Sequence, residues 1–308
     1  MHRPEPIQVS GMEKIILTTF TDPMMGLSYE CEPIFRKLES HFAGRIEFRY
    51  VMAGLVRDVG DFMTPEEREE TARDPKSGIR KYCLRLADIY RSEESITGMP
   101  IRMEGFHLFD AEHRSSWPLD IAYEAAKLTA PDKAERFLYR LRYATIVETR
   151  QTTKTEEQLR VAELSGIDLE AFTKALKNGT AEAAFREDRE MAGKLGIRSL
   201  PAYLLQYGEK AVLIRSLIGY EGFVSAIREL AKGEILPETP ALTEEAVTEL
   251  VGKRKLISLL ELKEAFGQDN RSTLLMILER LKSEKKVRLE GTDRDCFVFR
   301  NEQDPGKK

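Results

Sequence analysis

The stretch KIILTTFTDPMMGLSYECEPIFRKLESHFAGRIEFRYVM (residues 14–52) decides the fold. Its start, KIILTTF (14–20), is a short apolar run typical of a buried strand. From Tyr29 to Phe42 the apolar side chains recur at helical spacing, and Gly44 closes the segment. RIEFRYVMAGL (45–55) then alternates like a second strand. A strand, a helix and a strand in about forty residues predict a βαβ unit with parallel strands.

The chain from about Thr64 to residue 195 has the periodicity of successive helices. Ser115 and Ser116 precede Trp117-Pro118, which predicts a helix start with a hydroxyl cap. Thr155 and Gln158 are spaced as a capping box, and further helices are predicted after Asp168 and Thr180. We therefore expect a large helical insertion at about 64–195 rather than a linker.

After the insertion the sequence returns to β character. Two apolar runs within 196–219 flank YGEK (207–210), which predicts a hairpin, and a helix follows over 221–233. The segment 234–242 contains Pro237 and Pro240 and is typical of an interdomain linker. We expect few contacts across this linker, so that limited proteolysis releases a folded C-terminal fragment.

The C-terminal segment, 243–302, is predicted to be a winged helix. Thr243 caps a first helix, Ser258 and Glu261 form a capping box for a second, and a third helix begins at about Arg271. VRLE (287–290) and CFVFR (296–300) complete the pattern with a hairpin. Residues 1–11 are expected to form a loose arm, and 303–308 a disordered tail.

Composition favours a cytoplasmic protein without a membrane segment. A net charge of −4 with 42% hydrophobic and 32% charged residues gives no general attraction to nucleic acid or to anionic membranes. No apolar run approaches the ~20 residues that span a bilayer, and the polar start MHRPEPIQVSGMEK has no signal-peptide core. The three cysteines, Cys31, Cys83 and Cys296, lack CxxC spacing, which fits a reducing compartment.

Residues 21–33, TDPMMGLSYECEP, give the most specific signal. They resemble the active-site pattern D-P-x-C-x-x-C-[YW]-x-x-E-P of the DsbA family, including its FrnE-like members. Asp22, Pro23, Tyr29, Glu32 and Pro33 stand where that pattern has them. The resemblance covers about 12–232 and implies an α/β class: a thioredoxin fold with a DsbA-like helical insertion. SLP (199–201) resembles the loop that precedes the cis-proline of the family, which would be Pro201.

The two cysteines of the family pattern are replaced here. Met25 stands at the first position and Ser28 at the second, so no pair of thiols can exchange a disulfide. A methionine thioether has no ionisable proton and is a poor nucleophile, and we therefore assign no catalytic residue. Cys31 lies one turn further along the helix, where a small buried side chain is expected.

What remains is a binding surface beside the cis-proline. The family geometry would leave the main chain of Leu200 free to pair with an extended peptide. Met24, Met25 and Leu27 would supply a soft apolar floor, with Gly26, Ser28 and Tyr29 in the same segment. A protein of this kind also resembles the DsbA-like adaptors of the ClpXP protease, so we expect a protein or peptide partner. If this site was retained for binding, we expect a cis bond at Pro201 and partly exposed methionines. If the site is vestigial, we expect a loop or the winged helix to bury the methionines.

Two alternatives concern other ligands. The first is a glutathione-dependent transferase or isomerase of the kappa-class type, because that family shares the insertion topology. Its members have a serine at the first-cysteine position, where the hydroxyl can assist a glutathione thiolate. Here Met25 occupies that position and Ser28 has the only hydroxyl nearby, and glutathione stays an alternative cofactor. A ligand-sensing DNA-binding regulator is the other alternative. The C-terminal cations Arg271, Arg280, Lys282, Lys285, Lys286 and Arg288 are interleaved with Glu279, Glu284, Glu290, Asp293 and Asp295, which weakens the case for DNA.

No metal site is expected. His107, Asp110, Glu112 and His113 lie close together in sequence, but their spacing matches no common zinc motif. The sequence does not specify the oligomeric state.

Overall fold

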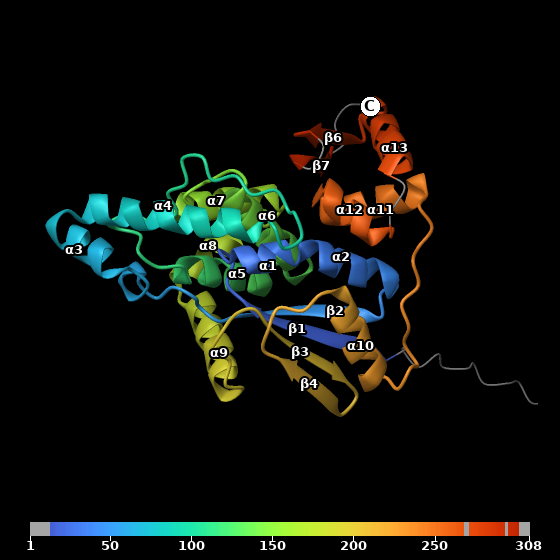
Figure 1. Cartoon of the computed structure of the whole chain (residues 1–308), viewed down its shortest axis with the longest axis horizontal. Helices are drawn as coiled ribbons and strands as arrows, with labels where there is room; N and C mark the ends of the chain where they lie inside the picture. The colour runs from blue at the N-terminus through green and yellow to red at the C-terminus, as the bar shows by residue number, and fades with distance from the viewer. Residues whose placement is uncertain (1–12, 268–270, 293–294, 302–308) are drawn as a thin grey trace, which may run out of the picture.

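The computed structural model describes residues 13–267, 271–292 and 295–301, and the predicted arm at 1–11 and tail at 303–308 lie outside these ranges. A four-stranded sheet of strand order β2-β1-β3-β4 forms the base of the molecule (Figure 1). β1 (Ile15–Thr21) pairs in parallel with β2 (Ile46–Met52), which confirms the predicted βαβ unit. β1 also pairs antiparallel with β3 (Ala202–Tyr207), and β3 forms the predicted hairpin with β4 (Lys210–Ile214).

Two helices cover one face of this sheet and form a core with it. They are α2 (Glu32–His41), which continues from the short α1 (Gly26–Glu30), and α10 (Tyr220–Leu230). Phe35 lies at the centre, with its ring centroid 5.9 Å from that of Phe48 and 6.1 Å from those of Tyr203 and Phe223. Edge-to-face contacts of this kind add specificity to the burial of apolar area.

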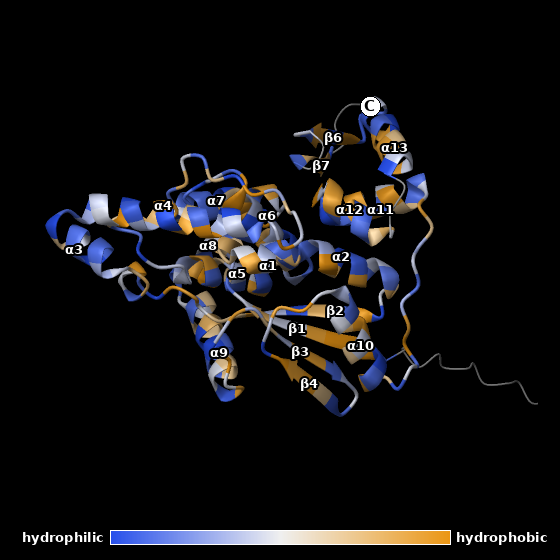
Figure 2. Cartoon of the chain, viewed as in Figure 1, coloured by the Kyte–Doolittle hydropathy of each residue, from blue (hydrophilic) through white to orange (hydrophobic). Residues whose placement is uncertain are grey.

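The helical insertion predicted at about 64–195 is confirmed. It holds the largest apolar cluster of the described residues, and Figure 2 shows the alternation of hydrophobic and hydrophilic residues along its helices. The helices are α3 (Pro65–Arg73), α4 (Pro75–Glu93), α5 (Trp117–Thr129), α6 (Ala134–Ile146), α7 (Thr155–Leu164), α8 (Leu169–Lys177) and α9 (Thr180–Lys194), with single 3-10 turns at Val59–Asp61 and Pro131–Lys133.

Two of the predicted helix caps differ in the structure. The N-cap residue of α5 is Ser116, but its hydroxyl donates to Asp22 Oδ2 (2.6 Å). The hydroxyl at this helix start comes from Ser115, which accepts from the N–H of Trp117 (3.2 Å). Before α7 the N-cap residue is Lys154, and Gln158 donates to the carbonyl of Thr152 (3.0 Å). In both places a buried polar group outside the helix competes successfully for the side chain. The cap at Asp168, which accepts from the Ala171 N–H at 2.7 Å, is confirmed.

The C-terminal unit (residues 243–301) contains α11 (Glu244–Arg254), β5 (Leu256–Ser258), α12 (Leu259–Ala265), α13 (Arg271–Ser283), β6 (Val287–Glu290) and β7 (Phe297–Arg300). Its sheet is antiparallel, in the order β5-β7-β6. The Thr243 cap and the Ser258–Glu261 capping box are confirmed. This order of elements is the one that the winged-helix prediction requires; residues 293 and 294 of the predicted wing turn lie outside the described ranges, and the assignment and its boundaries stay predictions.

The expectation of few contacts across the linker is wrong. α12 packs on α2 (Figure 1), and Leu256 and Phe297 of the C-terminal unit join the apolar core of the insertion. The ring of Phe297 lies edge-on to Tyr143 of α6, with 4.8 Å between the centroids. The prolines in 234–242 correctly indicated a connection without regular structure, but such a connection does not determine whether the two parts pack together.

Candidate functional site

The segment between β1 and α1 is a tight, internally bonded turn. The Asp22 carboxylate accepts from the N–H of Met24 (3.0 Å), and the Met25 N–H donates to the Asp22 carbonyl (3.1 Å). α1 starts at the next residue, with Met25 as its N-cap residue and no side-chain cap. The turn therefore places Met25 at the helix N-terminus, where the family pattern has the nucleophilic cysteine.

The two methionines do not form an exposed floor. Met24 is 3% exposed and Met25 is 7% exposed, while Leu27 is half-buried. The cover comes from α4 of the insertion, because the Tyr90 hydroxyl donates to the Met24 carbonyl. At Gly26 a Cβ atom would lie 2.5 Å from the ring of Tyr90, so only glycine permits this approach of the helix. The prediction of partly exposed methionines is wrong, and the covering element is neither a loop nor the C-terminal unit.

Ser28 is also engaged within the protein. It is 1% exposed, and its hydroxyl accepts from the Thr21 hydroxyl at 2.7 Å. Thr21 in turn accepts from the Arg142 guanidinium at 2.9 Å. Ser28 therefore does not cap α1, and its hydroxyl is not presented to a bound glutathione thiol in this conformation.

None of the three cysteines is placed for exchange chemistry. Cys31 is buried with its Sγ 3.3 Å from the Tyr203 hydroxyl, and burial raises its pKa to about 12. Burial likewise raises the pKa of Cys83 to about 11 and raises that of Cys296. The thiolate is the nucleophilic form, so all three thiols are inert near neutral pH.

This burial predicts the thiol reactivity. The native protein at pH 8 should release no thionitrobenzoate from Ellman's reagent on the timescale of minutes, whereas unfolding in guanidinium chloride should expose all three thiols. The Cys31→Ala variant should give the same native result. Rapid native reaction that disappears in Cys31→Ala would contradict the inert assignment and would restore a thiol-based mechanism.

Buried carboxyl groups surround the start of α1, and the first pair consists of Asp22 and Asp120. Asp22 accepts from the Leu55 N–H (2.7 Å) as well as from Ser116, and burial raises its pKa. Asp120 of α5 has a pKa raised well above its usual value, first by burial and then by the charge of Asp22. Asp120 lies in the first turn of α5, where an acid usually stabilises the helix N-terminus, so no sequence pattern indicated its contact with Asp22.

A second carboxyl pair lies between α1 and the end of α4. Glu30 accepts from the Thr97 hydroxyl (2.7 Å) and from the N–H groups of Thr97 (2.9 Å) and Gly98 (3.2 Å). Glu93 has one carboxylate oxygen that is buried without a hydrogen-bond partner among the described residues. Burial raises the pKa of both groups to about 7, and for Glu93 the charge of Glu30 adds to this effect.

The loop before β3 keeps an open main chain. The Leu200–Pro201 bond is cis, as predicted. Because Phe20 pairs with Ala202, Pro201 stands opposite Thr21, where the chain leaves β1 for the turn. Within the described residues, the main chain of Leu200 makes no hydrogen bond. Leu200 is half-buried, and its neighbours Arg198 and Ser199 are exposed.

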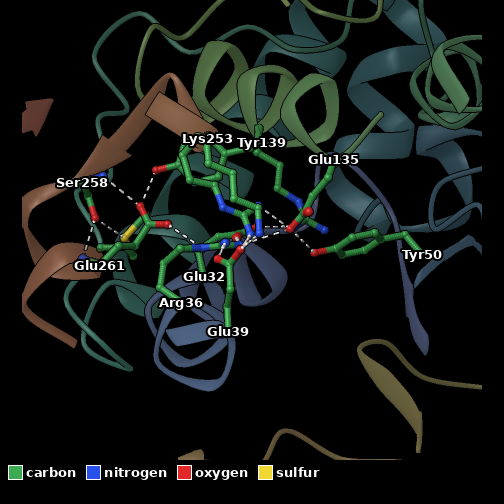
Figure 3. A network of polar contacts seen from close by, with 12 residues as sticks. Glu32, Arg36, Glu39, Tyr50, Glu135, Tyr139, Lys253, Ser258 and Glu261 are labelled. Atoms are coloured by element: carbon green, nitrogen blue, oxygen red, sulfur yellow. Dashed lines mark hydrogen bonds and ion pairs between the residues drawn. The ribbon is translucent and has the colours of Figure 1, made fainter. Parts of the chain in front are cut away.

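A polar network joins α2 to the insertion and to the C-terminal unit, and Arg36 is at its centre (Figure 3). The Arg36 side chain is 1% exposed and pairs with Glu32 and Glu39 of its own helix. Its guanidinium also lies 3.3 Å from Glu135 of α6 and 3.3 Å from Glu261 of α12. One arginine thus joins carboxylates of three separate segments.

Three further basic residues complete the network, and one of them, Lys253 of α11, pairs with Glu39. Arg142 donates to Glu32 at 2.7 Å, and Arg254 of α11 pairs with Glu39 and, at 2.5 Å, with Glu135. Burial tends to raise the pKa of Glu39, but the charges of Arg36 and Arg254 outweigh it and lower this pKa to about 2. The network is balanced in charge, which is the condition for burying this many ionised groups.

Glu261 links the capping box of α12 to this network. It accepts from the Ser258 N–H (2.8 Å) and from the Tyr139 hydroxyl (2.5 Å), as Figure 3 shows. Burial raises its pKa to about 7 in spite of the nearby Arg36. The capping-box spacing predicted the first of these contacts, but no local pattern indicated that Glu261 would meet Arg36.

The cations of the C-terminal unit are largely paired with its own acids. Arg280 pairs with Glu244 and Glu284, Lys286 with the same two residues, and Arg288 with Glu290. Such internal pairing leaves few charges free to neutralise phosphates, which counts against DNA binding by α13 and the hairpin.

The described residues contain neither a metal-binding cluster nor a membrane-spanning helix. No group of three or more histidine, cysteine or acidic side chains there is arranged to hold a metal ion; Asp110 instead bonds to His113 (2.9 Å) and Gln151 (2.7 Å). No helix in the described ranges has the length and apolar character needed to cross a membrane.

The parallel β1-α-β2 unit, the cis-proline before β3 and the inserted helices define a thioredoxin fold with a DsbA-like insertion. The chain belongs to the thioredoxin family, whose model matches residues 18–218. The ClpXP adapter protein SpxH of Halalkalibacterium halodurans is 22% identical over 219 residues, covering 69% of this chain and 66% of that protein, just under two thirds of its length. SpxH of Staphylococcus saprophyticus is 24% identical, covering 71% of this chain and 93% of that protein.

Among solved structures, the cytosolic disulfide reductase DsbM of Pseudomonas aeruginosa is similar in fold. It superposes with a TM-score of 0.52 at 18% identity, covering 70% of this chain and 98% of that one. This likeness concerns the fold alone.

Proposed function

We propose that this chain is a cytoplasmic adaptor that binds a protein partner without thiol chemistry and delivers it to a ClpXP-type protease. The observation that carries the proposal is the thiol-free start of α1: Met25 and Ser28 are buried where the family pattern has its cysteines, and Cys31 is inert. A thioredoxin fold without reactive thiols at this position is suited to roles that depend on binding rather than on electron transfer. The similarity to SpxH supports the adaptor role in particular.

The binding surface that fits best is the loop before Pro201. Its main chain is free at Leu200, and an extended segment of a partner could add to it by main-chain hydrogen bonds. Half-buried Leu27 and Leu200 would supply apolar contacts. Met24 and Met25 are not part of this surface, because both side chains are buried and the Met24 carbonyl accepts from Tyr90 of α4. Gly26, Ser28 and Tyr29 are buried as well.

Site-specific cross-linking in cells tests this surface. A photo-cross-linking amino acid in place of exposed Ser199 should give a discrete adduct with one partner protein, because position 199 adjoins the free main chain of Leu200. The same amino acid in place of exposed Lys174 on α8 is the matched control and should give none.

A second change, Leu200→Glu, should weaken the adduct at position 199 by one to two orders of magnitude, since a charge would enter the apolar contact, at about 1.4–2.8 kcal/mol. Leu169→Glu, on α8, replaces a leucine that is 37% exposed and should leave the adduct unchanged. An adduct of equal intensity in a stably folded Leu200→Glu protein would exclude the loop as the binding surface.

A further inference from the structure

A pocket of about 580 Å³ lies where the C-terminal unit meets α6 and the end of α7. Its volume is within the range of sites that hold small organic ligands. Seven basic and two acidic residues line it, in a chain whose net charge is −4. The basic residues are Lys133, Arg136, Arg140, Arg254, Lys255, Arg288 and Arg300.

Only some of these charges are satisfied within the protein. Arg140 forms a two-pronged pair with Glu148 (3.0 and 2.8 Å), and Arg288 pairs with Glu290. These two acids are the carboxylates of the pocket lining, and Arg254 is engaged by the network around Arg36.

Four cations of the pocket have no acidic partner within the ranges that the structure covers. Lys133 donates to the carbonyl of Gly166 instead, which leaves Arg136, Lys255 and Arg300. The Nη1 atom of Arg300 is moreover buried without a hydrogen-bond partner among those residues. The Arg300 main chain is fixed nearby, because its N–H donates to the carbonyl of Lys255 at 2.8 Å. A buried guanidinium donor without a partner is uncommon and indicates that something else satisfies it.

The lining has apolar parts as well. Leu164 and Leu256 are aliphatic, and Tyr139 and Phe299 are aromatic. Guanidinium groups are suited to phosphate because their fork of N–H donors matches its oxygens. We propose that this pocket binds a phosphate-bearing small organic molecule, with Arg136, Lys255 and Arg300 contacting the phosphate groups.

The position of the pocket gives such a ligand a further effect. Arg136 comes from α6 of the insertion, whereas Lys255 and Arg300 come from the C-terminal unit. A ligand that contacts both sides stabilises their packed arrangement in proportion to its occupancy. Ligand binding should therefore raise the unfolding temperature and slow proteolysis within 234–242.

Isothermal titration calorimetry with ATP and with pyrophosphate tests the proposal on the full chain. We expect saturable binding of at least one probe, one molecule per chain. Affinity should fall at least tenfold in Arg136→Ala/Arg300→Ala and severalfold in Lys255→Ala, which removes an exposed side chain. The control Arg80→Ala/Lys81→Ala removes two exposed cations from α4 and should bind as the wild type does.

The proposal is overturned if neither probe binds saturably at millimolar concentration, or if the pocket variants and the α4 control bind equally. Binding of a short DNA duplex that depends on Arg136 and Arg300, with no binding of either small probe, would also overturn it. In that case the basic surface would serve nucleic acid instead.

Discussion

Arg36→Ala should lower the free energy of unfolding by about 3–5 kcal/mol, which is the usual cost of removing one partner from a buried ion pair. The arginine is buried and contacts four carboxylates, of Glu32, Glu39, Glu135 and Glu261. Without it, these acids face one another in a poorly solvated interface. Because they belong to α2, α6 and α12, we also expect the C-terminal unit to separate from the rest of the chain.

Chemical denaturation and limited proteolysis measure the two effects separately. The wild type should resist cleavage within 234–242, and Arg36→Ala should release the C-terminal fragment early. Arg160→Ala, which removes an exposed arginine from α7, is the control and should change the free energy of unfolding by less than about 0.5 kcal/mol. If Arg36→Ala loses no more stability than this control, the network does not hold the two parts together.

Stability should decrease as the pH rises from about 5 to about 8. Burial raises the pKa of Glu30, Glu93, Glu124 and Glu261 to about 7, from an ordinary value of 4.5. The folded protein binds these protons more tightly than the unfolded chain, so the stabilisation is complete below pH 4.5 and is lost as the pH passes 7. The lowered pKa of Glu39, about 2, acts only at lower pH, where stability falls as this group is protonated.

Glu93→Gln isolates one of these groups. One Glu93 oxygen is buried and unpartnered among the described residues, so its ionised form is disfavoured in the folded state. At pH 8 the free energy of unfolding of the variant should be about 1–2 kcal/mol higher than that of the wild type, a value reduced for the partial exposure of the side chain. At pH 5 the two free energies should be equal. Glu156→Gln, an exposed position on α7, is the control. A variant that is less stable than the wild type at pH 8 would show that the Glu93 carboxylate has a partner.

The sequence predicted the features that depend on local patterns. The strands, the hairpin and the caps at Thr243 and Ser258 follow from short-range rules, and the structure has all of them. The cis bond at Pro201 was predicted from the resemblance to the DsbA family, and it is present as well. The failures come from contacts between distant segments. Serine is a residue type favoured at helix N-caps, but the hydroxyl of Ser116 donates to the buried carboxylate of Asp22 instead.

The most consequential wrong prediction was that Met24 and Met25 are partly exposed, because α4 covers this segment. Apart from Gly26, nothing local to residues 21–33 indicates that Tyr90 and Glu93 of α4 would lie against this segment. Gly26 was the available signal, since a glycine at the start of a helix permits the close approach of another element. The docking of the C-terminal unit failed for the same reason: the partners of Arg36 are spread over segments more than two hundred residues apart, from Glu32 to Glu261.

The half-life of the protein cross-linked at position 199 tests the central claim most directly. Pulse-chase labelling in cells should show that this partner is degraded severalfold faster when the chain is present than when its gene is deleted. The acceleration should require the protease and should be restored by the wild type and by Leu169→Glu, but not by Leu200→Glu. An unchanged half-life of the partner in all of these strains would contradict an adaptor function.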